Sequence, residues 1–197
     1  MIGVRAAFVD RDGVINELVP DPESGLPESP LNVEDVTLVP GAAAALASLA
    51  AAGWLLAGVS NQPAAAKGNV SVDQLLAVQS RVLDLLDEQG VHVDDFRLCL
   101  HHPEGTVPGL STACDCRKPA PGMLLEAGRA LAVDLARSWM IGDTDADVLA
   151  GRAAGCQTVL IQHLPSAHKR GGAETPTRIA ADLPAAARIL LESEPGA

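Results

Sequence analysis

The chain has 197 residues, of which 48% are hydrophobic and only 2% are aromatic, so we expect one core of Ala, Val and Leu in a single domain over residues 1–197. The formal net charge of −11 excludes a general basic surface of the kind that binds nucleic acid. No apolar run reaches the roughly 18 residues of a membrane span, and residues 1–9 lack a signal-peptide pattern, so we expect a cytoplasmic protein without a membrane partner, either a monomer or a small homo-oligomer.

Short apolar runs alternate along the chain with segments rich in helix formers. In chain order we expect a strand over 4–10, a helix over 41–53, a strand over 54–62, a helix over 71–90, a strand over 96–102, a helix over 121–133, a strand over 138–143, a helix over 145–155, a strand over 157–162, a mobile loop, and a last helix near 182–192. This alternation predicts an α/β fold, a Rossmann-like three-layer sandwich with a central parallel sheet. Ligands of such sheets bind beyond the carboxyl ends of the strands.

Two segments fall outside the alternation. Residues 17–35, rich in Pro and acidic residues, follow the first strand, and residues 98–123 follow the third. Both are expected to be loops at the same edge of the sheet, and neither is long enough to form a large cap domain.

Two carboxylates stand two residues apart in the segment FVDRDGVIN, where the first strand ends. Asp10 and Asp12 can therefore face one pocket, where one attacks a substrate and the other exchanges a proton. An Asp-rich turn without catalytic function explains this motif alone equally well.

Polar side chains also follow the other inner strands. Taken alone, a strand-end Ser-Asn pair is often a cap or turn, and a run of acids often marks a helix N-terminus. Beside Asp10, however, the acids predict a site for a hard divalent cation such as magnesium. These residues are Ser60 and Asn61 in the second strand, Lys118 after the third, and Asp143, Asp145 and Asp147 at the fourth.

The motifs D-x-D, S-N, K and G-D-x-x-x-D, in this order after separate strands, resemble the haloacid dehalogenase superfamily of phosphohydrolases. The resemblance implies that Asp10 attacks phosphorus and forms an aspartyl phosphate, while Asp12 protonates the leaving oxygen and then activates water. It also implies magnesium bound by Asp10, the backbone carbonyl of Asp12 and Asp143, with Asp147 supporting these ligands. Ser60, Asn61 and Lys118 would bind the transferred phosphoryl group.

A receiver domain, which is a phosphorylation switch, also combines an acidic pocket with a Ser or Thr and a Lys on an alternating fold. Its phosphoacceptor Asp lies at a middle strand, and it has no acid two residues later. Asp12 therefore favours the enzyme.

Three of the four cysteines and one histidine form the pattern C-x-H-x12-C-x-C, made of Cys99, His101, Cys114 and Cys116. Three thiolates and one imidazole are a usual ligand set for a structural zinc ion. Unrelated reduced thiols or a disulfide are the alternatives, but the crowding of the cysteines fits a metal site in a reducing compartment. Cys156 stands apart and is expected to be a small buried residue.

The segment CLHHPEGTVPGLSTACDCRKPAPGM, together with DRDGVIN and SNQ, resembles the D-glycero-D-manno-heptose 1,7-bisphosphate phosphatases. The resemblance implies that Arg117 binds the second phosphate of a bisphosphate, and that Gln62 and Lys67 contact the substrate. The chain departs from the family pattern at Pro63, Ala64 and Lys67, has Thr144 where Lys is frequent, and has a longer segment between residues 17 and 41.

We therefore expect a magnesium-dependent phosphomonoesterase with a structural zinc loop, acting on a small phosphorylated sugar. Removal of the 7-phosphate of the heptose bisphosphate is the predicted reaction. Histidinol phosphate, whose phosphatases have a shorter zinc loop, or another small sugar phosphate is the alternative substrate. A zinc-stabilised phosphate-binding protein without turnover is the alternative from another class.

Overall fold

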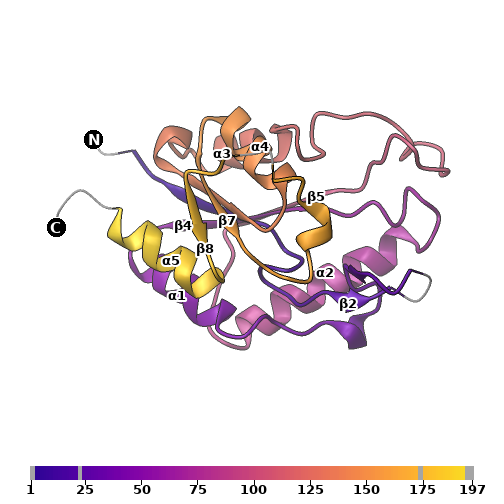
Figure 1. The fold of residues 1–197 in the computed structure, drawn as a ribbon, viewed down its shortest axis with the longest axis horizontal. Helices are drawn as coiled ribbons and strands as arrows, with labels where there is room; N and C mark the ends of the chain where they lie inside the picture. Colours follow the sequence, from indigo (N-terminus) through magenta and orange to yellow (C-terminus); the bar gives the residue numbers. More distant parts are fainter. Residues whose placement is uncertain (1–2, 22–23, 173–174, 194–197) are drawn as a thin grey trace.

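The computed structural model describes residues 3–21, 24–172 and 175–193 and contains a central six-stranded sheet between two layers of helices (Figure 1). All neighbouring strands of this sheet are parallel. Their spatial order is β5 (Asp95–Cys99), β4 (Leu55–Asn61), β1 (Ala6–Val9), β6 (Trp139–Gly142), β7 (Gln157–Ile161) and β8 (Arg178–Ala180). The predicted α/β fold with a parallel sheet is confirmed.

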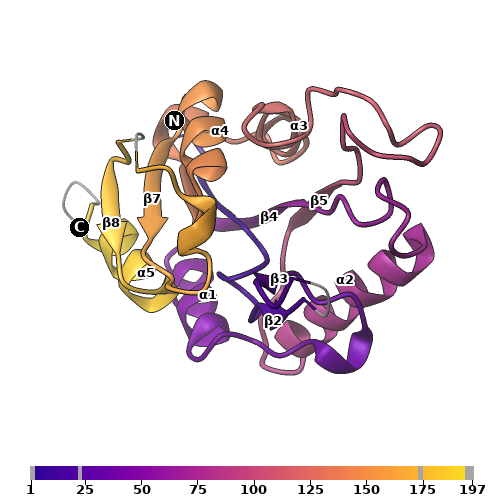
Figure 2. The ribbon, with the colours of Figure 1, turned by 45° about the vertical axis from the view of Figure 1, so that its right-hand side comes forward.

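The helices lie on both faces of the sheet, as Figures 1 and 2 show from two directions. The lower layer of Figure 1 holds α1 (Ala42–Ala51), α2 (Val72–Asp87) and α5 (Leu183–Glu192), and the upper layer holds α3 (Gly122–Ala130) and α4 (Asp145–Ala154). Along β1, Ala7 and Val9 belong to the core on the first face and Ala6 and Phe8 to the core on the second. This alternation is the pleat of a strand that is buried on both sides.

The helix and strand ends lie within a few residues of the predicted ones, because the sequence carries stop and start signals. Ser71 caps α2 by accepting a hydrogen bond from the Gln74 amide, and Asp182 caps α5 by accepting one from the Ala185 amide. Gly155 ends α4 in the left-handed conformation, with φ of 87°.

The structure differs from the expectation in the two connecting segments. The segment after β1 contains a small hairpin of β2 (Val19–Pro20) and β3 (Pro27–Glu28) followed by the 3₁₀ helix η1 (Val33–Asp35). The segment after β7, expected to be only a loop, contains the 3₁₀ helix η3 (Ala167–Lys169) and the strand β8. The sequence did not reveal β2, β3 and β8, because each has only two or three residues and lies at the edge of a sheet, where no long apolar run is needed. Another short 3₁₀ helix, η2 (Leu135–Arg137), precedes β6.

In the part of the chain that the structure describes, the segment after β1 forms nothing larger than this hairpin, so no large cap domain is present. The helices there also include none that is long and apolar enough to cross a membrane.

Candidate active site

The predicted catalytic residues meet at the carboxyl edge of the sheet, where they line a cavity of about 340 Å³. β1 lies between β4 and β6, so the residues that follow these three strands become neighbours. Lys118 reaches the same place from the long segment after β5. The lining includes Asp10, Asp12, Ser60, Asn61, Lys118 and Asp143.

Lys118 lines this cavity and is buried, with only 4% of its surface exposed. Its ammonium nitrogen lies 2.8 Å from Asp10 Oδ1 and 2.6 Å from Asp147 Oδ1, and it donates a hydrogen bond of 2.8 Å to the Val59 carbonyl. Burial alone would lower the pKa of Lys118, but the carboxylates of Asp10 and Asp147 outweigh this effect and raise it. The lysine is therefore a fixed positive charge beside Asp10.

Asn61 holds the lysine segment in place. Its side-chain amide donates to the Lys118 carbonyl at 2.9 Å and accepts from the Lys118 amide at 3.0 Å. This pair of bonds ties the end of β4 to the segment after β5. The structure thus shows Asn61 positioning Lys118, a role that sequence reasoning missed, while its predicted phosphate contact stays a prediction.

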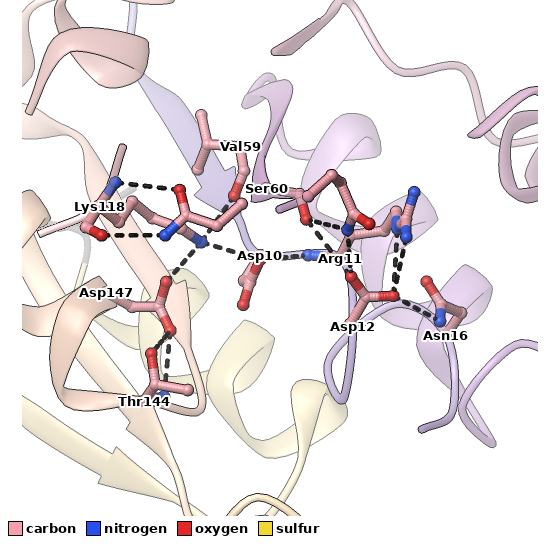
Figure 3. A network of polar contacts seen from close by, with 11 residues as sticks. Asp10, Arg11, Asp12, Asn16, Val59, Ser60, Lys118, Thr144 and Asp147 are labelled. Atoms are coloured by element: carbon pink, nitrogen blue, oxygen red, sulfur yellow. Dashed lines mark hydrogen bonds and ion pairs between the residues drawn. The ribbon is translucent and has the colours of Figure 1, made fainter. Parts of the chain in front are cut away.

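Asp12 lies on the other side of Asp10, which accepts a hydrogen bond of 2.8 Å from the Arg11 amide (Figure 3). Asp12 Oδ1 accepts from Arg11 Nε and Nη2, both at 3.1 Å, and from Asn16 Nδ2 at 3.0 Å. Its Oδ2 accepts from Gln62 Nε2 at 2.5 Å and from Ser60 Oγ at 3.4 Å. The predicted substrate residue Gln62 therefore contacts the acid Asp12 in this structure, and its contact with substrate stays a prediction.

This network determines the charge of Asp12. Burial raises the pKa of the Asp12 carboxyl, but the Arg11 guanidinium and the hydrogen bond from Asn16 together hold it below its usual value. Arg11 is itself fully buried and also bonds to Gln79 Oε1 at 3.2 Å. Sequence reasoning missed Arg11, although an arginine at a buried turn between two acids is the signal that could have revealed it.

Asp10 has the opposite shift. Burial and the nearby Asp147 carboxylate raise its pKa to about 8, against the effect of Lys118. Asp143 adds to this rise. Lys118 pairs with Asp10 and Asp147, while the third buried carboxylate, Asp143, has no such partner, so the cluster has an excess of negative charge that favours a proton or a metal ion.

The same cluster fits a magnesium ion. Asp10, Asp143 and Asp147 each offer an oxygen, and these oxygens lie within 4.8 Å of one another. Both carboxylate oxygens of Asp143 are buried without a hydrogen-bond partner in the described part of the chain, and His163 Nδ1 lies 3.7 Å from Oδ2. Gly13, with φ of 82°, has to be a glycine because a Cβ atom there would overlap Asp143 Oδ2.

The two other acids of the GDTDAD segment differ in position. Asp147 Oδ2 accepts from the Thr144 amide at 3.0 Å and from its hydroxyl at 2.6 Å, which forms a capping box at the start of α4. Asp147 Oδ1 also contacts Lys118, and the supporting role of Asp147 at the metal site stays a prediction. Asp145 instead accepts from the Gly171 amide at 2.6 Å, on the far side of the helix start.

Cys99, His101, Cys114 and Cys116 come together as a second candidate metal centre, with donor atoms within 4.8 Å of one another. The three Sγ atoms are 3.1 to 3.6 Å apart, and His101 Nδ1 lies 3.4 Å from Cys116 Sγ. None of these cysteines is in a disulfide. Burial and the neighbouring Cys99 thiol raise the pKa of Cys116, so a cation is needed to hold several thiolates here. The four residues fit a tetrahedral metal ion.

Further positive charges line the mouth of the cavity. Arg117 lies beside Lys118 and donates to the His101 carbonyl at 3.4 Å, and Lys67 lies in the turn after β4. Both are predicted substrate residues, and both line the cavity. A third cation, Lys169 of η3, was not predicted and pairs with Glu28 of the hairpin. Ser29, next to Glu28, also lines the cavity and holds the Asp12 pKa down through a hydrogen bond.

The parallel sheet, with carboxylates after β1 and β6 and a lysine fixed between them, defines a haloacid dehalogenase-like phosphatase. The family model described as "HAD-hyrolase-like" matches residues 115–186.

Sequence comparison identifies curated relatives. The chain is 43% identical to the D-glycero-beta-D-manno-heptose-1,7-bisphosphate 7-phosphatase of Rhodopseudomonas palustris over 150 residues, which cover 76% of this chain and 79% of that one. It is 38% identical to the phosphatase of the same name from Mesorhizobium japonicum, over 90% of this chain and 78% of that one. The chain therefore belongs to the heptose-1,7-bisphosphate 7-phosphatase family.

A solved structure shares the fold along almost the whole chain. The D,D-heptose 1,7-bisphosphate phosphatase from B. bronchiseptica, solved with magnesium and phosphate, has a TM-score of 0.79 and 31% identity. The alignment covers 97% of this chain and 99% of that one. The relative's complex agrees with the fit of magnesium to the acidic cluster described above.

Proposed function

We propose that this phosphatase removes the 7-phosphate of D-glycero-D-manno-heptose 1,7-bisphosphate, with magnesium at the acidic cluster and a structural zinc ion at the cysteine cluster. The names of the curated relatives support this substrate. The observation that carries the proposal is the contact of 2.8 Å between Asp10 and a buried Lys118 beside the unpartnered oxygens of Asp143. A phosphate there would meet a nucleophile, a cation and a metal site together.

In the first half-reaction the Asp10 carboxylate attacks phosphorus. The bond between phosphorus and the sugar oxygen breaks, and the phosphoryl group becomes an acyl phosphate on Asp10. Lys118 and Ser60 lie around Asp10, where they bind the equatorial oxygens of the transferred group. Magnesium held by Asp10, the Asp12 carbonyl and Asp143 would neutralise the charge of the two anions that meet there.

Asp12 transfers the protons in both half-reactions. It first gives a proton to the leaving sugar oxygen and then takes one from the water that attacks the aspartyl phosphate, which releases phosphate and restores Asp10. The Arg11 guanidinium favours the ionised form of Asp12, which suits the second step. For the first step, the arriving phosphate adds negative charge beside Asp12 and so favours its protonated form.

The zinc ion would act through position. Cys116 lies two residues before Lys118, so a metal held by the four ligands fixes the start of the segment that carries Arg117 and Lys118. Arg117, on the rim, would then bind the second phosphate, with Lys67 on the same side of the cavity.

Phosphate release tests the proposed function. The heptose bisphosphate, fructose 1,6-bisphosphate and histidinol phosphate are compared in the presence of magnesium. We expect kcat/KM for the heptose bisphosphate to exceed the others by at least about a hundredfold, which corresponds to ~2.7 kcal/mol of transition-state stabilisation. Equal, slow rates on all three substrates would contradict the assigned substrate.

Two variants show whether the release comes from this site. Asp10→Asn removes the attacking carboxylate and should lower kcat at least about a thousandfold while the circular dichroism spectrum and the zinc content stay unchanged. Asp84→Asn makes the same chemical change at an exposed position of α2 and should keep full activity. Substantial turnover by Asp10→Asn would rule out Asp10 as the nucleophile.

A further inference from the structure

An ion pair joins the two loops at the mouth of the active-site cavity. Lys169 Nζ of η3 lies 2.6 Å from Glu28 Oε2 of β3, although the two residues are 141 positions apart in the chain. Both side chains are partly exposed, Lys169 at 29% and Glu28 at 45%. Both also line the cavity that contains Asp10 and Lys118. The pair therefore lies where a substrate larger than phosphate has to pass or bind.

The basic side chains that line this cavity differ in how firmly they are held. Lys118 is buried and bound by two carboxylates and a carbonyl, so it serves the transferred phosphoryl group. Within the described part of the chain, the Lys169 ammonium is held by Glu28 alone, in a surface ion pair, and such pairs contribute little stability. A phosphate dianion carries more charge than a carboxylate and is the stronger partner for an ammonium group. An incoming phosphate can consequently replace Glu28 as the ion-pair partner of Lys169.

The position of Lys169 is also distinct. Arg117 and Lys67 approach the cavity from the segments after β5 and β4, on one side of β1. Lys169 approaches from the segment after β7, on the other side, where the start of α4 contributes only Thr144 and Ala146 to the lining. Among the described residues that line the cavity, Lys169 is the basic side chain on this side. A second phosphate at the mouth of the cavity would therefore meet Arg117 and Lys67 from one side and Lys169 from the other.

We propose that Lys169 binds the second phosphate of a sugar bisphosphate from the side opposite Arg117, and that Glu28 pairs with Lys169 until the substrate arrives. This inference rests on the proposed function, because it assigns the part of the substrate that stays intact. Glu28 keeps the lysine ordered at the mouth of the cavity in the free protein. The Glu28 carboxylate also repels anions and so weakens their binding. Only a phosphate that replaces Glu28 on Lys169 avoids this loss of affinity.

The ion pair could instead serve only to fasten the hairpin to the loop after β7. The two roles predict different effects of mutation. If the pair is only a fastening, removing either partner loosens the same contact, so Lys169→Met and Glu28→Gln change binding in the same direction. If Lys169 binds phosphate and Glu28 competes with it, Lys169→Met weakens binding of a bisphosphate, whereas Glu28→Gln strengthens it.

The experiment measures binding by calorimetry in the Asp10→Asn background with magnesium, so that turnover does not interfere. Two ligand pairs are used: the heptose 1,7-bisphosphate with the heptose 7-phosphate, and fructose 1,6-bisphosphate with fructose 6-phosphate. Lys169→Met should raise the dissociation constant of the bisphosphate about tenfold and leave that of the monophosphate nearly unchanged. Glu28→Gln should lower the dissociation constant of the bisphosphate, and Lys169→Arg should preserve its binding.

Arg188→Met is the matched control, because it removes one positive charge from an exposed position of α5, away from the cavity. It should leave all four dissociation constants unchanged. Equal effects of Lys169→Met on bisphosphate and monophosphate, or effects of Lys169→Met and Glu28→Gln in the same direction, would overturn the proposal. The absence of any preference for the bisphosphates in the protein with Lys169 intact would also overturn it.

Failure of the proposed function gives a different result. A protein with Asp10 intact that releases no phosphate from the heptose bisphosphate contradicts the assigned reaction. The fructose pair then still measures whether Lys169 distinguishes two phosphates from one.

Discussion

At the scale of single residues, the active site depends on two carboxylates with opposite pKa shifts. Burial and the nearby Asp147 carboxylate raise the pKa of Asp10 to about 8, against the effect of Lys118. Asp12, two residues later, lies against the buried Arg11, which lowers its pKa. One short turn thus provides Asp10, whose ionised form needs a further cation, and Asp12, whose ionised form is already paired with Arg11.

Magnesium binding should therefore depend on pH. Below about pH 8 the metal-free protein keeps a proton on Asp10, and the ion must displace this proton to bind. Since one proton is released, we expect the dissociation constant for magnesium to fall about tenfold for each unit of rising pH below 8 and to level off above it. Titration calorimetry on both sides of pH 8 measures this slope.

Asp10→Asn is the control for the pH dependence, because an amide at this position has no proton to lose in this range. Its magnesium affinity should be weaker and should not follow the same slope. A magnesium affinity of the unaltered protein that does not change between mildly acidic and alkaline pH would contradict the raised pKa of Asp10.

Most of the central site residues could be predicted from the sequence, because they follow strands. Asp10, Asp12 and Asp143 each come after or at the end of an apolar run, and the carboxyl ends of parallel strands meet. The partners of these residues could not be predicted. Arg11 stands between the two acids in the sequence, but only the fold brings Gln79 of α2 against its guanidinium and shows which way this buried side chain turns.

At the scale of elements, the segment between β5 and α3 combines the candidate metal centre with two of the site's cations. Cys99 and His101 lie at the end of β5, and Cys114 and Cys116 lie just before Arg117. The backbone that carries Lys118 is therefore held from two sides, by the cysteine cluster and by Asn61. Loss of the metal should loosen one of these two attachments.

Cys116→Ser tests this connection. We expect it to lose the zinc ion and to lower kcat/KM about tenfold or more, because the ligand lies next to the segment that positions Lys118. Elemental analysis measures the zinc, and phosphate release measures the activity. Thermal unfolding should occur at a lower temperature than in the unaltered protein.

Cys156→Ser is the matched control, because it changes a buried cysteine that lies after α4, outside the cluster. It should keep both zinc and activity. Full activity of Cys116→Ser without bound metal would show that the cluster does not position the lysine segment.

At the scale of the whole molecule, the sheet separates two cores, and the active site lies beyond its carboxyl edge rather than within either core. The core on the face of α1, α2 and α5 includes Leu49, which is fully buried. The core on the face of α3 and α4 includes Leu124, also fully buried. The chain has only two Trp and two Phe residues and no Tyr, so its stability depends on many contacts between small aliphatic side chains.

Leu49→Ala should therefore destabilise the protein without changing its chemistry. We expect the free energy of unfolding to fall by about 2–5 kcal/mol, as for other buried leucines, while kcat/KM below the unfolding transition stays unchanged. Urea unfolding and phosphate release measure the two quantities. Leu164→Ala, at a position 83% exposed, should change the free energy of unfolding by less than about 0.5 kcal/mol. A parallel loss of activity in folded Leu49→Ala would show that this core supports the site directly.

The sequence by itself determined the alternating fold, the strand-end acids, the lysine and the two pairs of metal-ligating residues after β5. These features are local, since apolar runs, helix caps and short ligand spacings each involve only a few consecutive residues. The tertiary structure alone decided that Asn61 holds Lys118, that Gln79 bonds to Arg11, and that Glu28 meets Lys169 across the cavity. Such contacts join side chains from distant segments, and no local pattern records them because only the packing of the whole sheet brings those segments together.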